Sequence, residues 1–413
     1  MLTLLIIAGL LVTFWTLSWA GLAWTDRGPA LAEPVPPGGA HLPAIDGLRG
    51  ILALSVVITH AHSTRSLYVV GRWVSDDSVF SQTGLYAVTL FFFITGFLFW
   101  SRLQRDPRPR LAKHFGSRAR RLGPAYRASM LLLFGIVAYQ SGWTLLEPVP
   151  LVVTEVVNWL GFMAWSPMPI NGLANSEFIN AGVAWTLRLE WLFYLMIPFC
   201  GWFAAKPWRA GLFLVVGTLG LRRLAMPAFS FEVIPAAVRA AAIQFSFFLM
   251  FVFSGGIAAA VVRTWIAGRL PAGLIRHPSV SALSLGGVVA VWLFGPADFG
   301  MVESGCLFVP FLLVALGNDW FGLLTTQTTL FLGKISYSIY LLHGFGLYLG
   351  MALINRFYPV ATMSGSLYRP LVAGLGGVII LGSTVWHQWF EAPFMRAKRP
   401  APAANLPLSP AQS

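Results

Sequence analysis

The chain has 413 residues, of which 57% are hydrophobic and only 10% are charged, and its mean hydropathy is +0.71. A soluble domain carries about 25% charged residues, so this composition excludes an ordinary soluble protein and predicts a polytopic membrane protein. The formal charge of +13 is gathered in a few short connections, which is typical of cytoplasmic loops and not of a nucleic-acid-binding surface. Cys200 and Cys306 both lie in apolar stretches, so neither a disulfide framework nor a thiolate metal site is expected.

Eleven apolar stretches are long enough to cross a hydrocarbon core of about 30 Å. They are residues 2–24, 47–64, 83–101, 124–141, 183–204, 210–226, 239–262, 280–296, 302–318, 329–350 and 368–389. The first has no basic residues before it and is followed by Asp26 and Arg27. We therefore expect residues 1–25 to form a retained transmembrane helix and not a cleaved signal peptide.

The stretch 149–165 is ambiguous. Pro148 and Pro150 lie at its start, and Glu155 and Asn158 lie within it, which makes it a poor lipid-facing span. It is either a crossing or an interfacial or re-entrant segment. Its status decides on which side of the membrane the preceding segments lie.

Charge predicts the orientation if 149–165 does not cross. The connection 102–127 is expected to be cytoplasmic because it holds nine basic residues: Arg102, Arg105, Arg108, Arg110, Lys113, Arg118, Arg120, Arg121 and Arg127. The amino terminus is then external, and residues 25–46, 205–209, 263–279 and 390–413 are cytoplasmic. Arg222 and Arg223 argue against this assignment because they fall near an external helix end. We expect residues 397–413 to form a disordered cytoplasmic tail.

Arg49 and His60 are two ionisable side chains on one apolar stretch. Eleven helical positions come to within about 20° of three full turns, so the two share a face and lie about 16 Å apart along the axis. Arg49 is then near the cytoplasmic interface and His60 is past the midplane, where a neutral imidazole can act as a general base toward a hydroxyl. Alternatively, His60 bonds between helices, Arg49 reaches the lipid headgroups, and Asp46 caps the helix and pairs with Arg49.

Arg118 and Arg121 have i, i+3 spacing and share a helix face just before the next apolar stretch. Such a guanidinium pair can grip the phosphates of a nucleotide-bearing donor. The alternative is a topology signal that touches anionic lipid, and the spacing does not separate the two.

Arg188 and Glu190 lie inside the apolar stretch 183–204, where a charge should face a cavity or a partner. Glu190 would orient His60, bind a hydroxyl of the acceptor, or simply neutralise an arginine. Weaker features are residues 91–97, 333–343 and 386–393, most of which we interpret as packing. His343 is a candidate second polar group of the site. The histidines show no metal-ligand spacing, so no metal site is expected.

Taken in order, these segments resemble membrane-bound acyltransferase family 3, which includes bacterial O-antigen and other glycan O-acetyltransferases. The resemblance covers residues 43–396 and rests on Ile45–Gly50 with His60, Phe91–Phe97, Arg118–Tyr126, Trp185–Tyr194, Ile335–His343 and the terminal Glu391-Ala-Pro393. It implies an all-α, polytopic transmembrane helical bundle of about ten helices, to which residues 1–25 add one N-terminal helix. Thr186 and Arg188 depart from the serine and less basic residues common in the family.

The resemblance implies an O-acyltransferase of the bacterial inner membrane. It would move an acyl group, commonly acetyl, from cytoplasmic acyl-CoA as co-substrate, with no tightly bound cofactor, to a hydroxyl of a glycan or small-molecule acceptor. It assigns Arg49 and His60 to the active site and Arg118 and Arg121 to a functional cytoplasmic loop. Glu190 also matches the family, and we count it as a third catalytic candidate. We hypothesise that His60 activates the hydroxyl while Arg49, Arg118 and Arg121 hold the donor. The competing hypothesis is a transporter or flippase of a lipid-linked glycan, in which Arg49, His60 and Glu190 form a polar pathway.

Overall fold

The computed structural model describes residues 42–74, 78–108, 111–163, 169–225, 236–266, 269–296 and 298–395. The helix expected over residues 1–25 and the tail 397–413 lie outside these ranges. Within them the chain is helical, and its β-structure is limited to one isolated bridge between Ile170 and Leu173. The predicted all-α class is confirmed.

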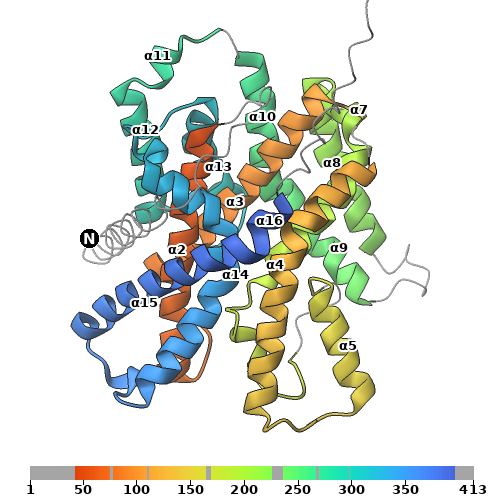
Figure 1. The fold of residues 1–413 in the computed structure, drawn as a ribbon. Helices are drawn as coiled ribbons and strands as arrows, with labels where there is room; N and C mark the ends of the chain where they lie inside the picture. Colours follow the sequence, from red (N-terminus) through yellow and green to blue (C-terminus); the bar gives the residue numbers. More distant parts are fainter. Residues whose placement is uncertain are drawn as a thin grey trace, which may run out of the picture.

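The helices follow one another along the chain as shown in Figure 1. Their bounds are α2 (Pro43–Val70), α3 (Ser78–Arg105), α4 (Leu111–Gln140), α5 (Val149–Leu160), α6 (Ala184–Met196), α7 (Gly201–Ala204), α8 (Pro207–Ala225), α9 (Ala236–Phe248), α10 (Ser254–Ile266), α11 (Ala272–Ile275), α12 (Pro278–Phe294), α13 (Met301–Leu316), α14 (Gln327–Asn355), α15 (Gly365–Trp386) and α16 (Ala392–Met395). Two π-helical segments, η3 (Leu249–Phe253) and η6 (His387–Glu391), join α9 to α10 and α15 to α16.

Six helical segments in the described ranges are long and apolar enough to cross a membrane. They are Pro43–Val70, Val79–Arg105, Phe115–Gln140, Ala242–Ile266, Gln327–Asn355 and Gly365–Met395. Helices α12 and α13 are apolar but shorter. The protein is therefore a multi-pass integral membrane protein.

Two expected stretches look different in the structure. Residues 183–204 form no single span, because α6 ends at Met196 and a 3-10 turn over Ile197–Phe199 separates it from α7. Pro198 lies in that turn and has no backbone N–H to continue an α-helix. The ambiguous stretch 149–165 contains α5, whose 12 residues rise only about 18 Å, well short of a bilayer core of about 30 Å.

Helices α2 and α14 lie against each other at the centre of the molecule (Figure 1). Glycines permit this approach: a Cβ atom on Gly50 would lie 2.7 Å from the Thr329 carbonyl oxygen, and one on Gly333 would lie 2.0 Å from the Asp46 carbonyl oxygen. The two backbones thus nearly touch, so side chains on either side of this seam are held at fixed positions.

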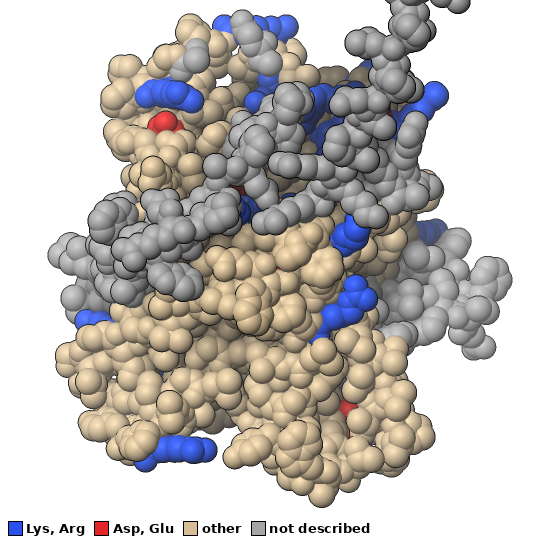
Figure 2. All heavy atoms as spheres, viewed as in Figure 1, with Lys and Arg blue, Asp and Glu red and all other residues tan. Residues whose placement is uncertain are grey.

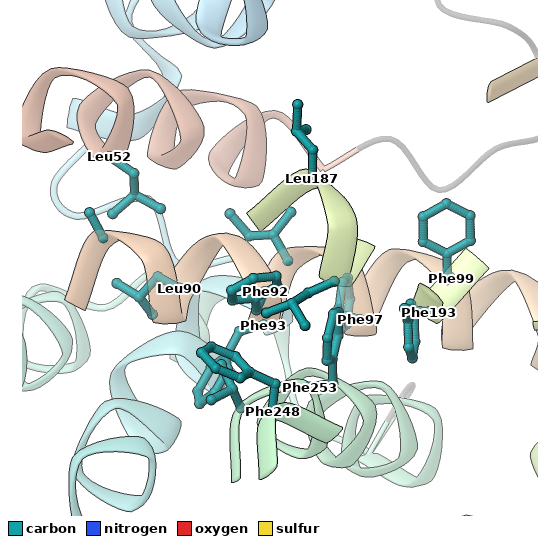
Figure 3. Packing of buried hydrophobic residues seen from close by; sticks show 14 of the residues in the cluster. Leu52, Leu90, Phe92, Phe93, Phe97, Phe99, Leu187, Phe193, Phe248 and Phe253 are labelled. Carbon is teal, nitrogen blue, oxygen red and sulfur yellow. The ribbon is translucent and has the colours of Figure 1, made fainter. Parts of the chain in front are cut away.

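Helix α3 packs into an aromatic core (Figure 3). Phe92 meets Phe253 edge-on with ring centroids 4.9 Å apart, and Phe93 meets Phe311 in the same way at 5.4 Å. Buried aromatic pairs of this geometry stabilise beyond their area alone. The first pair anchors α3 against the π-helical segment η3, and the second anchors it against α13.

Charged side chains are sparse on the face drawn in Figure 2, and most of the basic ones lie toward its upper end. In the same view, α7, α10 and α11 lie at that end (Figure 1). The rest of the visible face carries only a few scattered charged side chains, as expected for a surface largely in contact with lipid.

Candidate active site

A cavity of about 160 Å³ lies among five helices, α2, α3, α4, α6 and α14. Four of the five predicted site residues line it: Arg49, Arg118, Arg121 and Glu190. The polar part of the wall is completed by Thr95, Thr186, Tyr194, Ser336, Tyr337 and Tyr340. Residues more than 280 positions apart in the sequence therefore meet around one space, as a binding site requires.

Arg118 and Arg121 lie on one side of this cavity, on α4. The Arg118 guanidinium lies over the Phe99 ring, 4.5 Å from its centroid, and 5.6 Å from that of Tyr194. Aromatic faces stabilise a cation without using its N–H groups. The Nε atoms of both arginines are buried and have no hydrogen-bond partner in the described part of the chain. An anionic ligand would satisfy such donors.

Arg49 reaches the cavity from α2 and is half-buried. Its Nη1 lies 3.7 Å from Oδ1 of Asp46, one turn earlier on the same helix. The pairing with Asp46 that the sequence suggested is formed, but Asp46 does not cap the helix, because α2 begins at Pro43 with Leu42 as its N-cap. Arg49 pairs with Asp46 and lines the cavity at the same time, so this ion pair does not exclude a role of Arg49 in binding a ligand.

Glu190 is the acidic residue of the wall. Its Oε1 accepts hydrogen bonds from the Tyr194 hydroxyl and, at 3.4 Å, from the Thr95 hydroxyl. These bonds attach it to α3 and α6 and not to His60, contrary to one of our hypotheses. The neighbouring Arg188 points elsewhere and donates from Nη2 to Oε1 of Gln244 at 2.5 Å.

His60 lies outside the cavity wall. Its Nδ1 is 2.7 Å from Nε2 of His343, and the two rings are nearly parallel, with an interplanar angle of 6° and centroids 5.0 Å apart. His343 is fully buried. Its ring centroid lies 6.1 Å from that of Tyr340, which does line the cavity. The histidine pair therefore lies directly behind one wall of the cavity.

Two further aromatic residues lie near His60: Trp73, in the segment after α2, and Phe178, in the 3-10 turn Ser176–Phe178. The Trp73 ring lies 5.7 Å from the imidazole, and Phe178 stacks on Trp73 at 4.9 Å with an interplanar angle of 2°. Sequence reasoning missed both residues, because single aromatics outside the long helices carry no periodic signal. His343 was a candidate from the sequence. Tyr337 and Tyr340, which lie in the stretch interpreted mostly as packing, line the cavity, and their spacing of three from each other and from His343 places all three on one side of α14.

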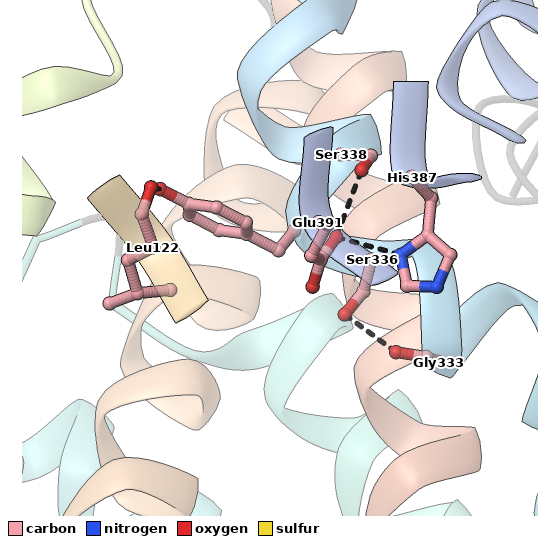
Figure 4. Close-up of polar contacts among 7 residues, drawn as sticks. Leu122, Gly333, Ser336, Ser338, His387 and Glu391 are labelled. Carbon is pink, nitrogen blue, oxygen red and sulfur yellow. Dashed lines mark hydrogen bonds and ion pairs between the residues drawn. The ribbon is translucent and has the colours of Figure 1, made fainter. Parts of the chain in front are cut away.

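A second polar cluster, drawn in Figure 4, includes Ser338 on α14, whose neighbours Ser336 and Tyr337 line the cavity. Oε2 of Glu391 accepts a hydrogen bond from Ser338 at 3.0 Å and lies 2.8 Å from Nδ1 of His387. Glu391 is 0% exposed and His387 is 4% exposed. The segment 386–393, interpreted as packing, thus supplies a buried carboxyl network. Among the described residues, no group of three or more His, Cys, Asp or Glu side chains is placed to hold a metal ion.

Comparison with known proteins places this arrangement in a family. The family model described as an acyltransferase domain matches residues 42–387, most of the chain. No curated protein and no solved structure matches the chain significantly. The match includes every predicted site residue, and it confirms the resemblance drawn from the ordered sequence blocks. Together with the six long apolar helices, it shows that the chain belongs to this acyltransferase family and is a membrane acyltransferase.

Proposed function

We propose that the protein transfers an acyl group, commonly acetyl, from cytoplasmic acyl-CoA to a hydroxyl of a glycan or another hydroxyl-bearing acceptor at the bacterial inner membrane. One observation carries this proposal: Arg49, Arg118 and Arg121, from two helices, line the same cavity as Glu190. Guanidinium groups are suited to phosphate oxygens, and a CoA donor carries several.

The length of the donor fits the separation of the two predicted ends of the site. Arg49 and His60 are about 16 Å apart along α2. The arm of acyl-CoA between diphosphate and sulfur has about a dozen bonds, which at an extended-chain rise of about 3.5 Å per three bonds spans about 14 Å. Phosphates held by the arginines would thus leave the thioester within reach of His60, on the far side of Tyr340.

The transfer itself needs a base and a leaving group. The acceptor oxygen forms a bond to the acyl carbon while its proton passes to the His60 imidazole. The carbon–sulfur bond then breaks, and the departing CoA thiolate takes the proton, which yields the ester and CoA thiol. Trp73 and Phe178 would offer an aromatic wall to the acceptor beside His60, a common way to bind a partly apolar ring.

Substitution of His60 by alanine tests the base. Membranes that hold their native acceptors are incubated with acetyl-CoA labelled in the acetyl group, and label in membrane glycan or in free acetate is measured. We expect the wild type to transfer label and His60→Ala to lose transfer, with protein level and membrane insertion unchanged. His62→Ala is the matched control, since His62 lies two residues away on α2 and stacks on Phe80 at 4.7 Å. Full activity of His60→Ala would remove His60 as base.

The same assay separates an enzyme from a transporter. A transporter or flippase would leave the labelled acetyl group on CoA while still requiring Arg49 and Glu190 for movement of its cargo. Absence of both transfer and hydrolysis by wild-type membranes would contradict the acyltransferase proposal.

A further inference from the structure

The hydrogen bond between His60 and His343 holds a single proton. The two nitrogens, Nδ1 of His60 and Nε2 of His343, are 2.7 Å apart. At that distance one must donate an N–H and the other must offer a lone pair. Two N–H groups cannot face each other there, and neither can two lone pairs. Which ring donates decides which nitrogen of His60 is left with a lone pair.

A second contact settles the direction. Nδ1 of His343 lies 3.1 Å from the backbone oxygen of Ile339. A carbonyl oxygen only accepts, so Nδ1 of His343 carries the hydrogen. In a neutral imidazole the other nitrogen, Nε2, is then unprotonated and accepts from His60. His60 therefore holds its own hydrogen on Nδ1, and its lone pair is on Nε2.

We infer that His343 is a positioning residue, which fixes His60 in the tautomer whose Nε2 takes the proton of the acceptor hydroxyl. This inference rests on the proposed function and adds to it the atom that acts as base and the residue that selects it. The arrangement follows the general logic of a catalytic base oriented by a third group. Here a neutral ring, and not a carboxylate, does the orienting.

The surroundings of His343 suit this role. The ring is 0% exposed. Its neighbour Gly344 has no room for a side chain, because a Cβ atom there would lie 2.2 Å from the Asn180 backbone carbon. A ring held this tightly keeps its acceptor nitrogen in place. When Nε2 of His60 gains a proton, Nδ1–H still points at the lone pair of His343, and the bond becomes charge-assisted and stronger.

Two substitutions separate positioning from packing. His343→Leu keeps an apolar side chain of moderate size but removes the acceptor, whereas His343→Gln keeps an amide oxygen that can accept from His60. We expect His343→Leu to lower kcat about 100-fold, at the lower end of the range for general base catalysis, with KM for the donor changed less than about threefold. We expect His343→Gln to restore kcat to within about tenfold of the wild type.

The tautomer is measured directly and without substrate. The protein is labelled with 15N in histidine, reconstituted in liposomes at alkaline pH, and the His60 signals are assigned by their loss in His60→Gln. The wild type should show a protonated Nδ1 and an unprotonated Nε2 on His60, and His343→Leu should show the other tautomer as well. His62→Leu should keep the wild-type pattern.

A protonated Nε2 on His60 in the wild type would overturn the inference. So would equal kcat for His343→Leu and His343→Gln when both remain folded, as checked by thermal unfolding. Because the spectrum requires no turnover, it tests the tautomer even if no acyl transfer is found. An active protein with the wrong tautomer would contradict only the role of His343.

Discussion

Glu190 and Glu391 are two carboxyl groups inside the same helical bundle, and Tyr337 lies near both. Glu190 is half-buried, lines the cavity with three arginines, and accepts from Tyr194 and Thr95. Glu391 is 0% exposed and bonds to Ser338 and His387. One carboxyl is open to a ligand and the other is closed within the protein. Both carboxyl groups lie in apolar surroundings, so that feature alone does not distinguish them. We expect Glu190 to act in transfer because it lines the cavity, and Glu391 to stabilise the fold because it does not.

The largest expected effect comes from removing the closed carboxyl. Glu391→Ala leaves Ser338 and His387 without their partner, at a cost of about 1–3 kcal/mol for each buried group. We expect a clear drop in the thermal unfolding midpoint in detergent and in the yield of folded protein. Glu391→Gln, which keeps an oxygen for Ser338, should lose less.

For Glu190 we expect the reverse: a loss of activity without a loss of stability. Glu190→Ala removes a wall residue of the cavity, so transfer activity should fall by at least about tenfold while the unfolding midpoint stays close to that of the wild type. The comparison fails if the two variants behave alike, or if Glu391→Ala is as stable as the wild type and inactive.

The effect expected from the arginines is on donor binding, and it sharpens the assignment of the cavity to the donor. A hydrogen bond to a charged group contributes about 1.5–3 kcal/mol, so Arg118→Ala or Arg121→Ala should raise KM for acyl-CoA about 10- to 150-fold. The measurement is initial rate against donor concentration in liposomes.

Arg120 is the matched control for this test. It lies between the other two arginines on α4, is exposed, and does not line the cavity. Arg120→Ala should leave KM unchanged. Equal increases for Arg120→Ala and Arg118→Ala would indicate a general effect of positive charge near the membrane surface.

Much of this arrangement could be predicted from the sequence. Apolar length identified the six long helices among its eleven predicted stretches, and the ordered blocks singled out Arg49, Arg118, Arg121 and Glu190, which meet in one cavity. The i, i+3 spacing of Arg118 and Arg121 correctly predicted a shared face, because both line that cavity. These features depend on local periodicity and on groups that are costly in an apolar setting.

The rest depends on contacts between distant segments. The approach of α2 to α14 at Gly50 and Gly333 brings His60 against His343, and no periodic pattern in either helix encodes that pairing. The sequence likewise could not show that Glu391 is sealed. Hydropathy alone suggested one span over 183–204, whereas a turn at Pro198 breaks it.

Tyr337 lies at the boundary between the two regions, and its hydroxyl gives the smallest expected effect. The side chain lines the cavity, and its hydroxyl donates to the Leu122 carbonyl oxygen at 3.0 Å. Tyr337→Phe keeps the ring and loses one hydrogen bond, at a cost of about 1 kcal/mol.

Tyr126→Phe is the matched control, because the Tyr126 hydroxyl donates to the Trp159 carbonyl oxygen at 2.6 Å and Tyr126 does not line the cavity. Both variants should lower the unfolding midpoint slightly and keep their transfer rates within about threefold. A loss of transfer confined to Tyr337→Phe would mean that this hydroxyl binds substrate. Tyr337 would then be part of the active site and not only a residue that stabilises the fold.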